Sequence, residues 1–474
     1  MILVALIFIP LVFGLASFFF KGADAVKTFS LIASIITLTA TFYAVSLPSE
    51  ALTYNHSWLS ALNSNFSLGV DGMAKVLVLL TSVSYPIIFI ATYKNQYKDT
   101  NQFYALMLLT QAGLMGVFLS TDCLLFYFFW ELALIPAYFL CSKWGGDKRI
   151  RTSFKFFIYT FVGSLIMLIG IIYLYSKTPD HSFAWSSFIK VHLNEQEQTY
   201  FFWFFFIAFA IKMPIFPFHT WQPDTYEQAP TAATMVLSGV MVKMGLFAVA
   251  RWLLPVFPEM AAKMTNTVMI LSIIGMIYAS LIAMKQDSIK RMIAYSSIAH
   301  IGLMCAALFT NNAQAIQGVY IQLFNHGVNV IGLWIVANAI EQQTGTSKMS
   351  ELGGLAHKAP VLAILLVVMA LANIALPITN AFVGEFLMFN GLFTFKPVFA
   401  AVAGISIILA AVYTLNTIQK VFLGEASTFQ KVTEIPKNTI IALGIIVVLV
   451  FLMGIYPKPM FYLGEQVIGW ISKK

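Results

Sequence analysis

The chain has 474 residues, a length that in a soluble protein would correspond to about two to four domains. Its composition excludes that class, because 59% of the residues are hydrophobic and 10% are charged, against roughly 25% charged residues in a soluble domain. The 28 basic and 20 acidic side chains are too few to cover a soluble surface of this size. The sequence therefore predicts an integral, multi-pass membrane protein in contact with the lipid bilayer.

The net charge of +8 does not indicate nucleic acid, because the basic residues form short clusters between apolar runs, as membrane topology requires. The cysteines, Cys123, Cys141 and Cys305, have no metal or redox spacing. No CxxC, HExxH, GxxxxGK[ST] or GxGxxG pattern occurs in the sequence. We therefore expect no cofactor and no metal in this chain, and an ion gradient or a partner as its source of energy.

Apolar runs of spanning length follow one another along the whole chain. A spanning helix needs about 20 apolar residues, and the runs predict an all-α polytopic membrane protein with about 14 transmembrane helices. The first run lacks a basic leader and a cleavage site, so we expect a membrane helix rather than a removable signal. The predicted helices cover 2–20, 28–47, 73–93, 102–120, 122–141, 152–175, 200–220, 229–253, 265–284, 291–310, 314–340, 360–389, 398–423 and 438–456.

The predicted helices fall into two blocks of five, with helices before and after them. Residues 1–101 hold the first three, 102–253 the first block, 265–424 the second block and 425–474 the last helix. Because each block has five helices, the second begins on the opposite side of the membrane from the first. This relation predicts an inverted repeat. The longest polar stretches, 48–72 and 176–199, are too short for a soluble domain.

The lysines and arginines predict the orientation. Seventeen of the 28 lie in alternate loops, beginning with the loop after the first predicted helix. Eight lie in the other loops and the C-terminus, and three lie inside the apolar runs. Since basic residues accumulate on the cytoplasmic side, both termini are predicted to lie outside.

Seven ionisable residues lie far inside the apolar runs, where a charge costs at least roughly 2.5–3.5 kcal/mol on insertion scales. Any one of them could be a hydrogen-bonded structural tie, but seven on six predicted helices favour a functional polar row. Lys75 is different, because it lies one turn inside its helix and can extend to the interface, which predicts a structural role. The seven residues are Glu131, Lys212, His219, Lys243, His300, His326 and Glu385.

Prolines lie beside two of these residues. Pro214 and Pro217 follow Lys212, and Pro377 precedes Glu385 by eight residues. Proline removes a backbone donor and frees a carbonyl, which is tolerated at membrane depth only in a hydrated or protein-filled interior. A packing kink would explain one such proline, but a break beside an ionisable residue, found twice, favours an ion site. We therefore expect broken helices at 200–220 and 360–389.

The chemistry of the row favours protons. Glutamate, lysine and histidine can each gain or lose a proton, whereas a sodium path would favour oxygen ligands. A buried lysine can give up its proton, so Lys212 could hold a proton while paired with Glu131 and release it on separation. An ion pair at about 4 Å is worth roughly 4 kcal/mol at an effective dielectric near 20. One proton crossing 100 mV requires about 2.3 kcal/mol, so such a pair is strong enough to drive the transfer.

Several segments resemble the M-type antiporter-like subunits of respiratory complex I, the NADH:quinone oxidoreductase. They are FSLGVDGMAKVLVLLT (66–81), FFWELALIPAYFL (128–140), AIKMPIFPFHTWQPDTYEQAPTAATMVLSGVMVKMG (210–245), RMIAYSSIAHIGLM (291–304) and FVGEFLMFNG (382–391). The resemblance implies proton-transfer roles for Glu131, Lys212, Lys243, His300, His326 and Glu385.

Glu385 sets the subtype, because the resembling N- and L-type subunits usually have lysine there. The missing C-terminal lateral helix also argues against the L-type. One departure is Pro377-Ile378-Thr379, where the family usually has Pro-Gly-Thr.

The resemblance implies a proton-translocating subunit whose partners are other membrane-arm subunits, especially the N- and L-type, in a bacterial cytoplasmic (inner) membrane. Flavin, iron–sulfur clusters and quinone would lie in partner subunits, so the chain belongs to an enzyme without holding its redox site. One alternative is a subunit of a multisubunit cation/proton antiporter or of a membrane-bound hydrogenase. Another is a structural membrane scaffold whose buried pairs are satisfied.

Overall fold

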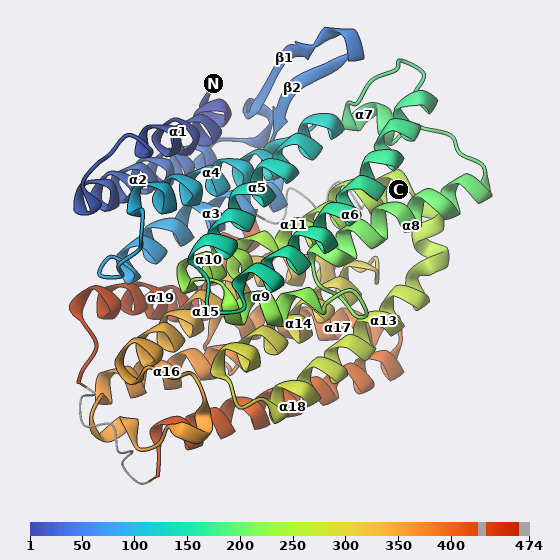
Figure 1. The fold of residues 1–474 in the computed structure, drawn as a ribbon. Coiled ribbons are helices and arrows are strands. Elements are labelled where there is room, and N and C mark those ends of the chain that lie inside the picture. Colours follow the sequence, from blue (N-terminus) through green and yellow to red (C-terminus); the bar gives the residue numbers. More distant parts are fainter. Residues whose placement is uncertain (425–432, 464–474) are drawn as a thin grey trace.

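The computed structural model describes residues 1–424 and 433–463, and these form a bundle of long helices with one small hairpin (Figure 1). Residues 425–432 and 464–474, which belong to the predicted C-terminal unit, lie outside the described part. The main elements are α1 (Ile2–Ser17), α2 (Ala23–Ser46), β1 (Thr53–Leu59), β2 (Ser64–Gly69), α3 (Gly72–Ala91), α4 (Thr100–Leu119), α5 (Cys123–Trp144), α6 (Arg149–Lys177), α7 (Trp185–Phe188), α8 (Glu195–Lys212), α9 (Trp221–Gln228), α10 (Thr231–Val236), α11 (Lys243–Ala248), α12 (Leu254–Val256), α13 (Pro258–Lys285), α14 (Ile289–Leu308), α15 (Ala313–Thr344), α16 (Pro360–Asn373), α17 (Asn380–Phe395), α18 (Pro397–Phe422) and α19 (Lys437–Ile455).

Helices cover each of the predicted apolar runs, because in lipid a helix satisfies its own backbone polar groups. Eleven helices within the described residues are long and apolar enough to cross a membrane, with α10 to α12 taken as one. Helices α1 and α16 are apolar but shorter. The chain is thus a multi-pass membrane protein, while a total of about 14 spans stays a prediction.

Three segments form the centre of the bundle: α3, the run from α10 to α12, and α15. The apolar parts of the α10–α12 run and of α15 are fully buried inside the chain. Helix α15 packs against α14, α16, α17 and α19 as well as α3. The N-terminal helices α1 and α2 lie on one side of the bundle, and α18 lies on the other (Figure 1). This arrangement places the polar residues of α11 and α15 far from lipid.

The prediction of an all-α chain missed a two-stranded antiparallel hairpin, β1–β2, in the polar stretch 48–72. The turn uses Asn63 in the left-handed region (φ 49°). Asp122, which caps α5, accepts hydrogen bonds from the Ser64 hydroxyl (3.1 Å) and the Asn65 amide (3.0 Å). Burial raises the pKa of the Asp122 carboxyl. Sequence reasoning missed the hairpin because it counted only spanning apolar runs.

Contacts between loops agree with the predicted alternation of the helices across the membrane. At the hairpin end, Asn63 Nδ2 donates to the Asp180 carbonyl (3.0 Å). Lys75 Nζ also reaches the Leu47 carbonyl there (2.8 Å), the interfacial position predicted for it. At the opposite end, Gly146 N donates to the Gln228 carbonyl (2.7 Å).

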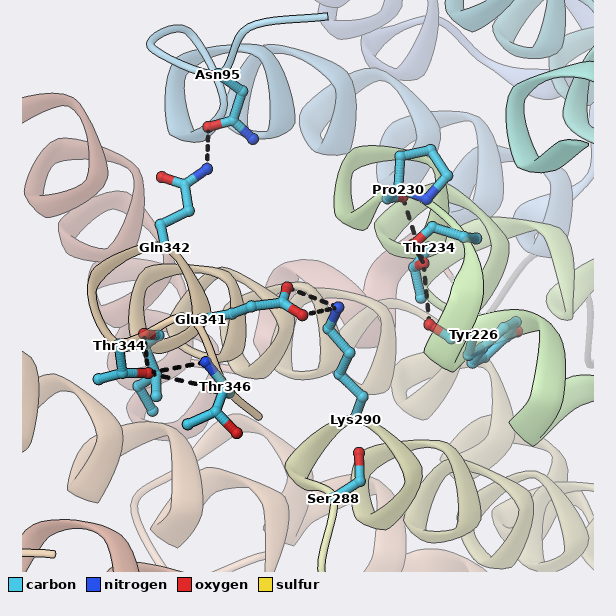
Figure 2. Close-up of polar contacts among 12 residues, drawn as sticks. Asn95, Tyr226, Pro230, Thr234, Ser288, Lys290, Glu341, Gln342, Thr344 and Thr346 are labelled. Atoms are coloured by element: carbon cyan, nitrogen blue, oxygen red, sulfur yellow. Dashed lines mark hydrogen bonds and ion pairs between the residues drawn. The ribbon is translucent and has the colours of Figure 1, made fainter. Parts of the chain in front are cut away.

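A polar network near this second end joins α14, α15 and the loop before α4. Figure 2 shows the ion pair between Lys290 and Glu341 (2.6 Å) and the hydrogen bond from Gln342 to Asn95 (2.7 Å). The second end also holds most of the basic loop residues. The positive-inside rule predicts that it is cytoplasmic.

Candidate functional site: a buried row of titratable residues

Both predicted helix breaks are present. Helix α8 ends at Lys212. Residues 213–220 form turns rather than a continuous helix, and α9 then runs from Trp221 to Gln228. Helix α16 ends at Asn373 and α17 starts at Asn380. The range 200–220 was too short for the first broken helix, because its second half is polar and carries no apolar signal. The two breaks lie in oppositely directed helices, as an inverted repeat requires.

Lys212 is held at the first break without a polar partner. Its side chain is buried, and Nζ lies 5.4 Å from the ring centroid of Trp130 on α5 without a hydrogen-bond partner among the described residues. Glu131, the next residue on α5, is half-buried and has one carboxylate oxygen without a partner. The two side chains interact electrostatically without a direct ion pair, which is the separated one of the two arrangements expected for them. The aromatic face of Trp130, which the sequence did not single out, lies within cation–π distance of the Lys212 ammonium.

Lys243 follows a π-helical turn in the middle of a fully buried segment. The turn covers Leu237–Met241, and Lys243 Nζ donates to the carbonyl of Ser238 within it (2.7 Å). A π turn changes the hydrogen-bonding pattern of a helix and is frequent at functional sites. Here it supplies a carbonyl to a buried ammonium that forms no ion pair with any acidic side chain in the described part of the chain. Nothing in the sequence pattern predicted this turn.

The second block brings three of the predicted residues together. His300 Nδ1 lies 3.0 Å from Glu385 Oε1, and both side chains are about nine-tenths buried. The rings of His300 and His326 are 5.5 Å apart between centroids. His326 interacts electrostatically with both Lys243 and His300. Glu385, His300, His326 and Lys243 therefore form one connected group across four helices.

Amide side chains on α15 complete this group, and the sequence reasoning did not single them out. Gln322 Nε2 donates to Glu385 Oε1 (3.3 Å). At the edges of the second break, Asn325 Nδ2 donates to the Asn380 carbonyl (2.7 Å) and Asn329 Nδ2 to the Ala372 carbonyl (3.2 Å). Asparagine amides therefore satisfy two of the backbone carbonyls at this break. A polar row at i, i+3, i+4 and i+7 in an apolar run was the available signal.

The second break contains strained backbone. Ile378 has φ 74° and Ala375 has φ 54°, in the left-handed region that favours glycine. The backbone of Ile378 also packs closely against Gly454 of α19, where a Cβ would meet the Ile378 carbonyl oxygen at 2.1 Å. Strained residues persist where the surrounding structure holds them, and they gather at functional sites. The isoleucine at the family's usual glycine position thus keeps a glycine-like turn.

A small cavity adjoins Glu385 and His300 and reaches the second break. Its polar lining includes Asn373 and Tyr413. The Tyr413 hydroxyl donates to Ser296 Oγ (2.8 Å), which also accepts from Asn373 Nδ2 (3.2 Å). The carboxylate of Glu385 therefore has polar surroundings beyond its direct partners.

His219 lies apart from the row, inside the first break. Its ring packs against Phe216 and Tyr278, and its Nδ1 has no hydrogen-bond partner among the described residues. Its electrostatic neighbour is Lys155 of α6. His219 therefore belongs to the α9 side of the break.

The Lys212 and Lys243 sites meet where α8 packs against α11. A Cβ at Gly245 would lie 2.7 Å from the Phe209 carbonyl oxygen and 2.8 Å from Met213 N. Because only a glycine permits this approach, the two helices touch next to both lysines. The row thus runs from Glu131 through the centre of the bundle to Glu385. Within it, His300 and Glu385 are in direct polar contact, and the other steps, including the one between the lysines, are not bridged by a hydrogen bond between described row residues.

Among the described residues, no group of three or more histidine, cysteine, aspartate or glutamate side chains could hold a metal ion. The three cysteines are free and buried.

Comparison with known proteins identifies the family. Residues 120–411 match the family described as NADH:quinone oxidoreductase/Mrp antiporter, TM. The chain is 36% identical over 466 residues to NADH-quinone oxidoreductase subunit M of Rickettsia prowazekii, covering 95% of this chain and 94% of the relative. It is 34% identical over 471 residues to F(420)H(2) dehydrogenase subunit M of Methanosarcina mazei, covering 96% and 94%.

The fold has a solved counterpart in respiratory complex I from Thermus thermophilus with bound NADH. The TM-score is 0.91 and the identity 27%, over 99% of this chain and 100% of the matched chain. The chain therefore belongs to the NADH:quinone oxidoreductase/Mrp antiporter family of multi-pass membrane proteins, and within it to the M-type subunits of NADH-quinone oxidoreductase.

Proposed function

We propose that this chain moves protons across the membrane through its buried row of glutamate, lysine and histidine, driven by redox chemistry in other subunits. One observation carries the proposal: titratable side chains follow one another through the bundle interior and adjoin both broken helices. Buried ionisable residues in a membrane protein are expensive and typically mark proton relays. Every side chain named in the row can hold or release a proton.

The two ends of the row differ in a way that suits alternating pairs. Glu131 does not bond to Lys212 in the first block, whereas Glu385 contacts His300 in the second. Closing one acid–base pair stabilises a proton on its basic member, and opening it favours release. If the pairs open and close in turn, a proton bound in one block is passed on as the other block releases one.

The pathway requires water or side-chain motion between Lys212 and Lys243. Buried polar atoms that have no hydrogen-bond partner within the described residues occur at Lys212, Trp130 and His326. Such groups in a polar interior normally bind water. We infer that the step between the lysines runs through water.

The family supports a proposal about the partners. We propose that the chain assembles with the N- and L-type antiporter-like subunits in a bacterial cytoplasmic membrane. Flavin, iron–sulfur clusters and quinone would be held by other subunits, and none by this chain. The relatives named as NADH-quinone oxidoreductase subunits support NADH as the electron source. The F(420)H(2) dehydrogenase relative shows that similar chains occur with another donor.

Two measurements test the proposal. The tagged chain should co-purify with flavin- and iron–sulfur-containing subunits, and its membranes should oxidise NADH; recovery with antiporter subunits alone would indicate a cation/proton antiporter instead. Lys212→Met should then lower proton uptake per electron in sealed vesicles. A structural scaffold predicts unchanged pumping in that variant, and that result would exclude a proton-transfer role for Lys212.

A further inference from the structure

Four charged side chains join the two blocks at the predicted cytoplasmic end. We call them the clamp: Lys155 on α6, Asp224 and Glu227 on α9, and Arg291 on α14. Asp224 accepts from Lys155 Nζ (2.8 Å) and from Arg291 Nη1 (3.0 Å), and Glu227 accepts from the same Arg291 nitrogen (3.1 Å). All four side chains are half-buried. A half-buried network is screened less than single surface pairs, so it can hold its elements together.

Helix α9 needs such support, because it is short and cut off from α8 by the break. It has eight residues, and an isolated helix below about 12–15 residues is marginal in water. Trp221 Nε1 ties its start to the Ile211 carbonyl (2.9 Å), and Gly146 N ties its end to the Gln228 carbonyl (2.7 Å). Between these two ties, the ion pairs of Asp224 and Glu227 connect its polar side to the neighbouring helices.

The clamp also fixes the backbone beside His219. Lys155 Nζ donates to the Thr220 carbonyl (2.8 Å) in addition to Asp224, and the Tyr159 hydroxyl bonds to the Thr220 hydroxyl (3.0 Å). Thr220 directly follows His219, a residue that is 3% exposed and whose Nδ1 has no hydrogen-bond partner among residues 1–424 and 433–463. The position of this imidazole is therefore set by contacts that Lys155 makes together with Asp224.

Arg291 connects this arrangement to the second block. It lies on α14 nine residues before His300, the partner of Glu385. Nine residues of helix span about 13.5 Å, and α14 is unbroken between them. A rigid helix carries a displacement at one end to the other, so a shift that accompanies the His300–Glu385 pair reaches Arg291 and, through Asp224, the first break.

We propose that Asp224 and Arg291 are positioning residues for proton transfer, which couple the state of the His300–Glu385 pair to the access of protons at His219. The inference rests on the proposed proton-translocating function. The clamp residues do not themselves carry the transferred proton. Its role is to hold α9, and hence the first break, in register with α14.

The test uses the assembled complex in sealed vesicles, with proton uptake measured per electron transferred. The difference in proton uptake between wild type and Lys212→Ala defines the share of uptake that this chain contributes. Asp224→Asn and Arg291→Gln should each lower that share at least about fivefold, the lower end of typical allosteric coupling. Because both act through one clamp, the double variant should be no worse than the worse single one. Arg291→Lys, which keeps the charge but loses the planar guanidinium whose Nη1 contacts both acids while Nε donates to Gln286 Oε1, should retain part of the share.

Arg151→Gln is the matched control, because Arg151 is exposed on α6 at the same end of the bundle and should leave pumping unchanged. Hydrogen exchange of the backbone amides of 213–228 should increase in Arg291→Gln and not in Arg151→Gln. Clamp variants that behave like the control, or losses that simply add in the double variant, would overturn the proposal. If Lys212→Ala itself pumps normally, the proposed function fails as well, so the two failures are distinguishable.

Discussion

The contact between His300 and Glu385 gives the sharpest functional prediction. Two unit charges 3.0 Å apart attract by about 5.5 kcal/mol at an effective dielectric near 20. That energy is available only while His300 is protonated, and desolvation of both groups reduces it. A proton moved against 100 mV requires about 2.3 kcal/mol, so forming or breaking this pair is enough to drive about one transfer.

Glu385→Gln removes the negative charge while keeping the shape and the ability to bond to Gln322 and His300. We expect this variant to assemble and to lose most of this chain's share of proton uptake, because His300 no longer gains a charge partner. Glu385→Lys should keep part of that share, since a buried lysine can still titrate and can donate to neutral His300. The order from wild type through Lys to Gln is the expected result.

The assay is proton uptake by sealed vesicles, divided by the rate of electron transfer and by the amount of assembled complex. Division by electron transfer separates a pumping defect from a slow redox step. The control is Gln314→Glu on α15, an exposed position where a charge change should have no effect. If Glu385→Gln pumps as well as wild type, Glu385 has a structural role and its attraction to His300 does not drive proton transfer.

Three other results are expected. Lys212→Ala and Glu131→Ala should each reduce pumping strongly without loss of assembly, and Glu131→Asp should be milder because its charge is kept; normal proton uptake in either alanine variant would contradict the row. Lys243→Arg should fail like Lys243→Ala, because guanidinium does not deprotonate, and wild-type uptake in the arginine variant would reduce Lys243 to a fixed charge. Ile378→Gly should raise the free energy of unfolding by up to about 1 kcal/mol, because relief of a left-handed strain of roughly 1–2 kcal/mol exceeds the entropy cost of glycine. Ile374→Gly is the control, because Ile374 has an unstrained φ of −90° and its replacement should lower the free energy of unfolding. Thermal denaturation of the purified complex measures both variants.

The positions of the helices and of both breaks were predictable from the sequence. Lipid requires each crossing segment to be apolar and to satisfy its own backbone, so a run of about 20 apolar residues indicates a helix with little regard to its neighbours. The cost of burying charge likewise singled out Glu131, Lys212, Lys243 and Glu385 before any contact was known. A lysine in the middle of an apolar run has few explanations other than function.

Only the tertiary structure decided which of these residues meet. Packing around α15 brings His300 to Glu385 and leaves Lys212 over the ring of Trp130 rather than on Glu131. The π turn beside Lys243 depends on close packing between its helix and the neighbouring helices. The free-energy cost of its irregular backbone must be offset by contacts with residues that are distant in sequence. Hydropathy reports how far each residue lies from water, and it carries no information on rotation about the helix axis within a fully buried segment. That rotation selects the partners, and it is set by the packing of the whole bundle.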